Sequence, residues 1–82
     1  MNKEAAHIIS KQIGSILKFE RMRQHITIAT IADAVEVNAS TIVSVEEAKH
    51  QASFVLIYGM LQYLKINPTD FFKLLERNES SS

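Results

Sequence analysis

Apolar residues recur at three- and four-residue intervals along most of this chain, which is the spacing of side chains on one helical face. No segment alternates between apolar and polar residues over a useful length, as a half-buried strand does. The pattern therefore predicts an all-α, compact five-helix domain over residues 1–77 and a flexible polar tail over residues 78–82. The first predicted helix covers residues 3–24, the second and third lie within residues 27–46, the fourth covers residues 54–65, and the fifth ends near Arg77.

The stretch of residues 27–46 is the centre of this pattern, because it contains two short amphipathic runs separated by a break. Ile31 and Val35 lie four residues apart and share one face of the first run. Ile42 and Val45 lie three residues apart and share one face of the second. Two short helices joined by a tight break are typical of a helix-turn-helix.

Polar residues that can cap a helix stand at the start of each predicted helix after the first. Their side-chain oxygens can accept hydrogen bonds from the unpaired N–H groups of the first turn. The capping candidates are Thr27, Asn38, Ser53 and Asn67. Gly14 lies inside the first helix, where glycine costs about 1 kcal/mol relative to alanine, so we expect close packing against a neighbour there.

The composition narrows the class of protein. A length of 82 residues makes one small domain, and an apolar content of 46% argues against disorder. The chain has no cysteine, so neither a disulfide nor a thiolate metal site is available. The N-terminus has no signal-peptide pattern, and the most apolar run, residues 54–66, is too short to span a bilayer. We therefore expect a cytoplasmic protein that does not associate with a membrane.

Charge is unevenly distributed, although the formal net charge is zero. Residues 1–26 hold five basic and two acidic side chains, a net charge of +3. Residues 27–53 hold one basic and four acidic side chains, a net charge of −3. The candidate helix-turn-helix is therefore acidic, which is unfavourable beside a phosphate backbone.

The order of five helices is accompanied by a set of apolar positions: Ile31, Ala32, Val35, Val37, Ile42, Val45, Leu64 and Ile66. In these features the chain resembles the Cro-type, lambda-repressor-like helix-turn-helix family, the Xre regulators of bacteria and phages. The resemblance covers residues 13–72 and implies a compact five-helix DNA-binding domain with its helix-turn-helix at the second and third helices. It also implies a partly buried ion pair, because Arg21 and Glu46 stand where the family pairs an arginine with a glutamate. The alternative is that both are ordinary surface charges.

The chain departs from the family pattern at positions that bear on DNA contact. The family usually has a glutamine that bonds a phosphate where this chain has Ile28, and a glycine where it has Glu36. Without glycine, the residue at position 36 must take or avoid a left-handed turn conformation. The base-facing positions hold none of the arginine, lysine, asparagine or glutamine side chains that make strong bidentate base contacts.

The first functional hypothesis comes from the resemblance: a repressor-like DNA-binding transcriptional regulator that reads an operator as a homodimer. The second motif helix would enter the major groove of double-stranded DNA, with hydroxyl groups on base edges and apolar groups on thymine methyls. The start of that helix and the loop after it would hold phosphates. The candidate DNA-binding residues are Ile28, Asn38, Ala39, Ser40, Thr41, Val43, Ser44, Lys49, His50 and Gln51.

The second hypothesis keeps the fold and assigns it to protein interaction, as an antirepressor or a partner of another regulator. The acidic motif, the apolar Ile28 and Val43 at expected contact positions, and the lack of basic residues favour this assignment. An apolar surplus on the first and fourth helices suits a partner under either hypothesis.

A homodimer is expected because the core of an 82-residue chain cannot readily take every apolar side chain of the last two helices. The alternative is that all of these side chains serve the core of one chain. The candidate interface residues are Tyr58, Tyr63, Phe71, Phe72 and Leu75.

Nothing in the sequence favours an enzyme. The three histidines, at positions 7, 25 and 50, are widely spaced and have no pattern of metal ligands around them. Glu46 and Glu47 are adjacent, so they point in different directions on a helix and cannot form a facing catalytic pair. With only two glycines, the chain has no glycine-rich phosphate loop. We expect no enzymatic activity, no metal and no cofactor.

Overall fold

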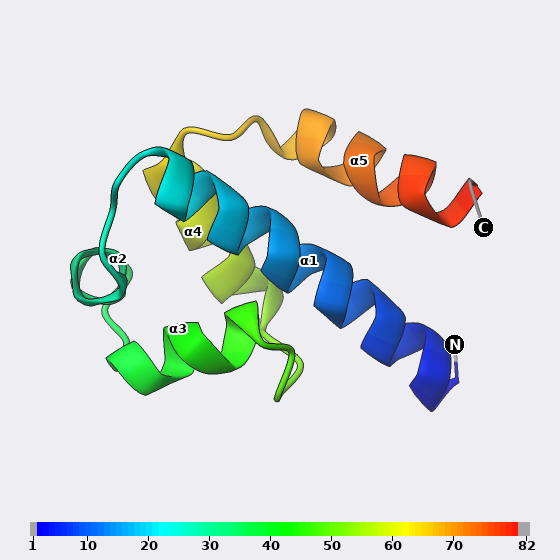
Figure 1. Ribbon diagram of the computed structural model, residues 1–82, viewed down its shortest axis with the longest axis horizontal. Helices are drawn as coiled ribbons and strands as arrows, with labels where there is room; N and C mark the ends of the chain where they lie inside the picture. The colour runs from blue at the N-terminus through cyan, green and yellow to red at the C-terminus, as the bar shows by residue number, and fades with distance from the viewer. Residues whose placement is uncertain (1, 81–82) are drawn as a thin grey trace.

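Five α-helices and their connections make up the computed structural model, which describes the backbone of residues 2–80 and the side chains of residues 2–75 (Figure 1). No strand occurs within residues 2–80, so the predicted all-α, five-helix fold is confirmed. The helices are α1 (Lys3–Arg23), α2 (Ile28–Ala34), α3 (Ala39–Glu46), α4 (Phe54–Leu64) and α5 (Pro68–Ser80).

The helix boundaries fall close to the predicted ones, with the largest difference at the C-terminal end. α5 continues to Ser80, beyond the predicted end near Arg77. No glycine or proline follows Pro68 to stop the helix. Residues 78–80, expected in a flexible tail, therefore continue α5, while the rest of that expected tail lies outside the described residues.

Side-chain caps begin four of the helices. The residues that accept from a first-turn N–H group are Asn2 for α1, Thr27 for α2, Ser53 for α4 and Asn67 for α5. Asn38 occupies the N-cap position of α3 in an extended conformation, but its side chain makes no capping bond. The expected Asn38 cap is therefore corrected: the Thr41 N–H donates instead to the Asn38 backbone carbonyl at 2.9 Å.

A left-handed residue follows each of the first four helices, and none of the four is glycine. These residues are His25, Glu36, Ala48 and Lys65, with φ between 55° and 61°. After each one, the next N–H donates to a carbonyl five residues earlier, at 2.8–3.0 Å, which is the bond of a Schellman motif. Glu36 thus takes the left-handed conformation that position 36 was expected either to take or to avoid.

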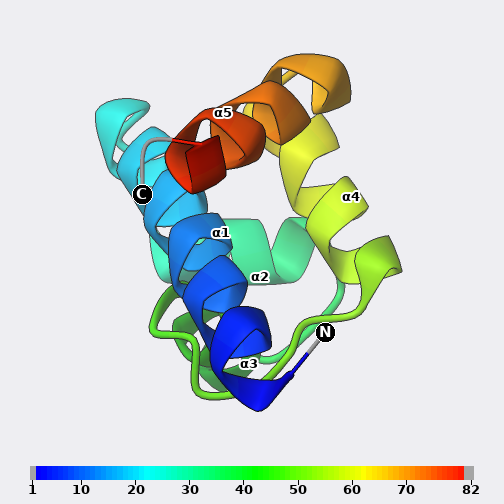
Figure 2. The ribbon, with the colours of Figure 1, turned by 90° about the vertical axis from the view of Figure 1, so that its right-hand side faces the viewer.

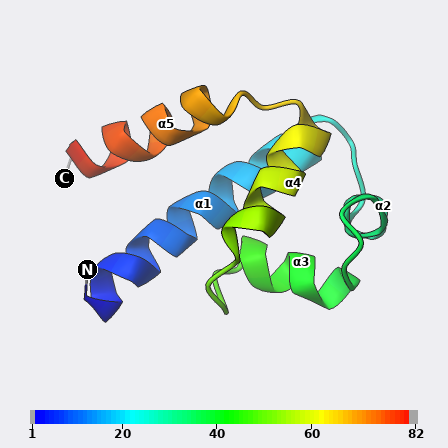
Figure 3. The same cartoon turned by 180° about the vertical axis from the view of Figure 1, so that it is seen from behind.

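The hydrophobic core lies between α1 and the other four helices. α1 packs against α3, α4 and α5, and α2 packs against α3 and α4. Figure 2 shows α5 lying across α1, and Figure 3 shows α4 in front of α1 with α3 below it. The buried apolar residues are Leu17, Ile31, Ala32, Ile42, Val45, Met60, Leu61, Leu64 and Phe71.

Burial also corrects part of the expected dimer interface. Phe71 is 0% exposed and belongs to the core of one chain, so it is not available to a second. Leu75 is partly buried and packs against the same core. Tyr58, Tyr63 and Phe72 are exposed.

No single helix within residues 2–80 is long and apolar enough to cross a membrane.

Candidate nucleic-acid interface

The α2–α3 pair has the geometry of a helix-turn-helix. The two helices are bent by 108° at a short break, within the range of about 90–120° typical of this motif. At the turn, the Val37 N–H donates to the Ala32 carbonyl at 3.0 Å. Ala32 is buried, and its small side chain allows the two helices to approach each other closely.

α3 is seated against α1 by direct backbone contact at Gly14. A Cβ atom at this position would lie 2.5 Å from the Val45 carbonyl oxygen and 2.6 Å from the Glu46 carbonyl oxygen. These are backbone atoms that cannot rotate away, so only glycine fits without moving α3. The close packing expected at Gly14 is confirmed.

Arg21 and Glu46 join the same two helices through a buried pair. The Arg21 Nε donates to Glu46 Oε2 at 2.7 Å, and Nη2 donates to Oε1 at 3.2 Å. The remaining guanidinium nitrogen, Nη1, donates to the Ile26 carbonyl at 2.8 Å. The two side chains are 10% and 3% exposed, so both charges are buried. Removal of either one would leave the other buried without a partner. The pair fixes the C-terminal end of α3 on α1.

The face of α3 that points away from α1 is open to solvent. Ile42, Val45 and Glu46 are its buried residues. Helical spacing therefore points Ser40 and Ser44 away from the core. The predicted contact residues on this helix are all accessible: Asn38, Ala39 and Ser40 are exposed, and Thr41, Val43 and Ser44 are half-buried.

Glu47, which is not among the predicted DNA-binding residues, belongs to the same outward face. It follows Ser40 at seven residues, which is two helical turns, and it is exposed. The Lys49 Nζ lies 3.3 Å from a carboxylate oxygen of Glu47, and the two side chains are 62% and 48% exposed. Counting outward from Ser40 at helical spacing would have identified Glu47 from the sequence.

The loop after α3 brings the predicted phosphate-contacting residues beside the helix. A hollow of about 300 Å³ is lined by Ser40 and Ser44 of α3 and by His50 and Gln51 of the loop. Lys49 is exposed beside it. Most of the predicted site is thus continuous over α3 and this loop. Ile28 is separate: it begins α2, is half-buried and packs against the core.

Comparison with known proteins bears on the fold. No protein-family model matches the sequence, and no curated protein matches it significantly. Among solved structures, the chain is similar to a single-residue variant of the restriction-modification controller protein C.Esp1396I. The TM-score is 0.78, with 14% sequence identity over 89% of this chain and 95% of that one. The chain therefore shares the fold of that controller protein.

Carboxylates surround the start of α3 in this helix-turn-helix. Asp33 and Glu36 line a shallow depression together with Asn38 and Thr41, the first residues of the candidate site. Both carboxylates are exposed. With Glu47 at the other end of the helix, acidic groups flank the open face of α3 on two sides.

Within the described part of the chain, no group of three or more His, Cys, Asp or Glu side chains could hold a metal ion.

Proposed function

We propose that this protein is a DNA-binding transcriptional regulator that reads an operator with α3 and acts as a homodimer in the cytoplasm. One observation carries the proposal: α3 is held rigidly on α1 by Gly14 and by the Arg21–Glu46 pair, while its opposite face is left open. A rigid helix with one open face is what insertion into the major groove needs.

The open face favours a particular kind of base contact. Ser40, Thr41 and Ser44 carry hydroxyl groups that can donate to or accept from base edges, and Ala39 and Val43 can pack on thymine methyls. None of these residues makes the bidentate contact that selects guanine or adenine strongly. The operator is therefore expected to be recognised through several weak contacts, including thymine methyls.

Phosphate contacts are expected to be few. The loop offers Lys49, His50 and Gln51, and Lys49 already lies beside Glu47. Each phosphate that a cation neutralises contributes about −0.9 to the slope of log K against log salt concentration. A dimer with few such contacts should bind random duplex DNA weakly and show a shallow salt dependence.

A titration of the protein with a pool of random duplexes, followed by selection of the bound fraction, tests the proposal. We expect measurable binding at low salt, loss of binding as salt rises, and enrichment of thymine-containing sites. Glu47→Lys should strengthen binding to the random pool by removing repulsion, while Glu4→Lys, far along α1, serves as the matched change of charge. Absence of binding by the wild type and by E47K would contradict the proposal.

A second candidate function is protein interaction, as an antirepressor or a partner of another regulator. The carboxylates of Asp33, Glu36 and Glu47 around α3 favour it, because an acidic surface suits a basic protein partner better than a phosphate backbone. The same titration separates the two functions. A wild-type protein that ignores DNA while E47K binds would favour the protein-interaction function.

A further inference from the structure

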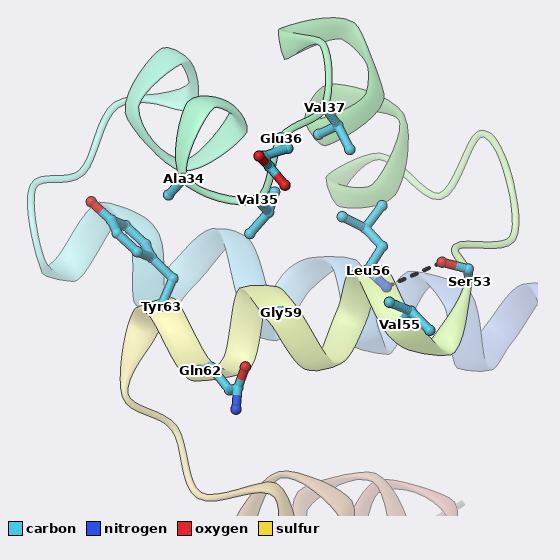
Figure 4. Close-up of a pocket in the computed structure, with 10 residues that line it drawn as sticks. All are labelled: Ala34, Val35, Glu36, Val37, Ser53, Val55, Leu56, Gly59, Gln62 and Tyr63. Atoms are coloured by element: carbon cyan, nitrogen blue, oxygen red, sulfur yellow. Dashed lines mark hydrogen bonds between the residues drawn. The ribbon is translucent and has the colours of Figure 1, made fainter.

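A groove of about 590 Å³ lies between α4 and the end of α2 (Figure 4). Figure 4 shows Gly59 between Val55 and Tyr63 on the α4 side, with Glu36 on the opposite side. Among the described residues that line the groove, Glu36 alone carries a charged side chain. The groove therefore offers little that would distinguish one apolar partner from another.

The outer side of α1 is a second exposed apolar surface. In Figure 1, α1 lies in front of α4, and no other helix of the described chain covers its near side. Three large apolar side chains of α1 are open to solvent: Ile8, Phe19 and Met22 are 49%, 64% and 57% exposed. Exposed apolar side chains that are scattered singly need no explanation, whereas a continuous patch marks an interaction site.

Helical spacing places these side chains in one continuous row. Ile8, Ser15 and Met22 follow one another at seven residues, which is two helical turns, and Phe19 stands one turn after Ser15. At a rise of 1.5 Å per residue, the row is about 21 Å long. Ser15 is exposed, and its small side chain leaves a hole between the larger side chains on either side. A row that repeats every seven residues and includes such a hole suits packing against a second helix.

Two lysines border this row on one side. Lys11 and Lys18 are also seven residues apart, and they follow Ile8 and Ser15 at three residues, so they are neighbours of the row on the helix surface. Both lysines are exposed, and neither forms an ion pair with another residue of the described chain. Glu4 stands one turn before Ile8, beyond the N-terminal end of the row. The outer face of α1 is therefore apolar along its middle and positively charged along one edge.

This combination of features selects among partners. A phosphate backbone could pair with the lysines but would leave the apolar row in water. Basic segments that bind anionic membranes usually carry clusters of about four to eight lysines and arginines, more than this face has. A helix with an apolar stripe bordered by carboxylates matches both the row and the lysines, because opposite charges beside an apolar seam set the choice and orientation of a partner helix.

We propose that the outer face of α1 docks an acidic amphipathic helix of another protein. A large apolar side chain of that helix is seated at Ser15, and its carboxylates face Lys11 and Lys18. α3 packs on a different side of α1, at Gly14 and Arg21, so the docked helix leaves the open face of α3 free. The proposal thus goes beyond the proposed function and holds whether or not α3 binds DNA.

Two synthetic helical peptides test the proposal. One has leucines along one face with glutamates beside them, and the other has lysine in place of each glutamate. Titration of isotope-labelled protein, followed by NMR, gives both the affinity and the contact surface. We expect the acidic peptide to shift the amide signals of residues 8–22 and to bind about ten-fold more tightly than the basic peptide.

Variants of the protein assign this preference to the face itself. The double variant Lys11→Glu with Lys18→Glu should reverse it and favour the basic peptide. Phe19→Ser should weaken binding of the acidic peptide, because part of the apolar row is lost. The matched control is Lys65→Glu with Lys73→Glu, which makes the same change of net charge at exposed positions outside α1 and should keep the wild-type preference. Circular dichroism checks that each variant is folded.

Three outcomes would overturn the proposal. One is the absence of shifts on residues 8–22 at millimolar acidic peptide, and another is equal affinity of the wild type and the K11E/K18E variant for that peptide. The third is binding to vesicles of phosphatidylserine and phosphatidylcholine without binding to the peptide, which would assign this face to a membrane surface. Failure of the protein to bind DNA concerns the proposed function alone, since these titrations contain no DNA.

Discussion

The two glycines of this chain lie in contrasting regions, although both stand inside a helix. At the crossing of α1 and α3, a side chain at Gly14 would collide with two backbone carbonyls at 2.5 and 2.6 Å. At the groove beside α4, a side chain at Gly59 would make one ordinary contact at 3.6 Å. The first glycine is needed by the fold, and the second is not. The comparison separates a rigid support for α3 from a position on α4 where the fold of one chain does not require glycine.

The largest expected effect is at the rigid crossing. Arg21→Ala leaves the Glu46 carboxylate buried without a partner, so the free energy of unfolding should fall by about 3–5 kcal/mol. Urea unfolding followed by circular dichroism measures the loss. The double variant Arg21→Met with Glu46→Leu should recover much of it, because neither charge remains buried. A loss within the range of about 0.5 kcal/mol typical of surface sites would show that the pair does not support the crossing.

Gly14→Ala should cause the next largest fall in the free energy of unfolding. Its Cβ forces α1 and α3 apart, and overpacking of this kind costs about 1–3 kcal/mol. The same urea experiment measures it, and Ser15→Ala on the exposed side of α1 is the control. A variant as stable as the wild type would mean that the crossing can relax, and would remove the contrast between the two glycines.

Gly59→Ala should instead raise the free energy of unfolding. Alanine is the better helix former and its Cβ fits, so the isolated chain should gain about 0.5–1 kcal/mol. The measurement belongs at protein concentrations low enough to keep the chain monomeric. A destabilised monomer would show that the fold itself requires Gly59.

The smallest effect on stability is expected at the Glu20–Arg23 ion pair of α1, which includes neither of the two glycines. A hydrogen bond from Arg23 lowers the pKa of Glu20, against a smaller opposing effect of burial. A lowered pKa in the folded state stabilises the protein above the ordinary glutamate pKa of about 4.3, and that contribution is lost as the pH falls through the folded value. Glu20→Gln should therefore lower stability slightly at neutral pH and leave it unchanged in strong acid. An equal difference at both pH values would exclude the carboxylate as its cause.

The parts of the fold that follow local rules were predictable from the sequence. Gly14 stood out because glycine is costly inside a helix, and its close contact is present.

Two expectations within the fold were wrong. The Asn38 side chain does not cap α3, because the Thr41 N–H is already satisfied by a backbone carbonyl. Phe71 and Phe72 are adjacent and equally apolar, so the sequence could not tell which of them faces the core. The structure buries Phe71 and exposes Phe72.

The surfaces were harder to predict than the core. The groove at Gly59 depends on how α2 and α4 are placed relative to each other, which no pattern within either helix specifies. Helical spacing from Ser40 predicts the outward position of Glu47, which lies beyond the last apolar residue of α3. Whether the open face of α3 meets DNA depends on the balance between its hydroxyl groups and the carboxylates around it.

Amide chemical-shift mapping by NMR, with a duplex selected for binding, tests the central claim most directly. We expect the shift changes to concentrate on residues 38–47 of the α3 region and on residues 49–51 of the loop, while residues 54–64 of α4 stay unchanged. Shifts centred on α4, or none at saturating DNA, would contradict the claim that α3 is the surface this protein presents to DNA.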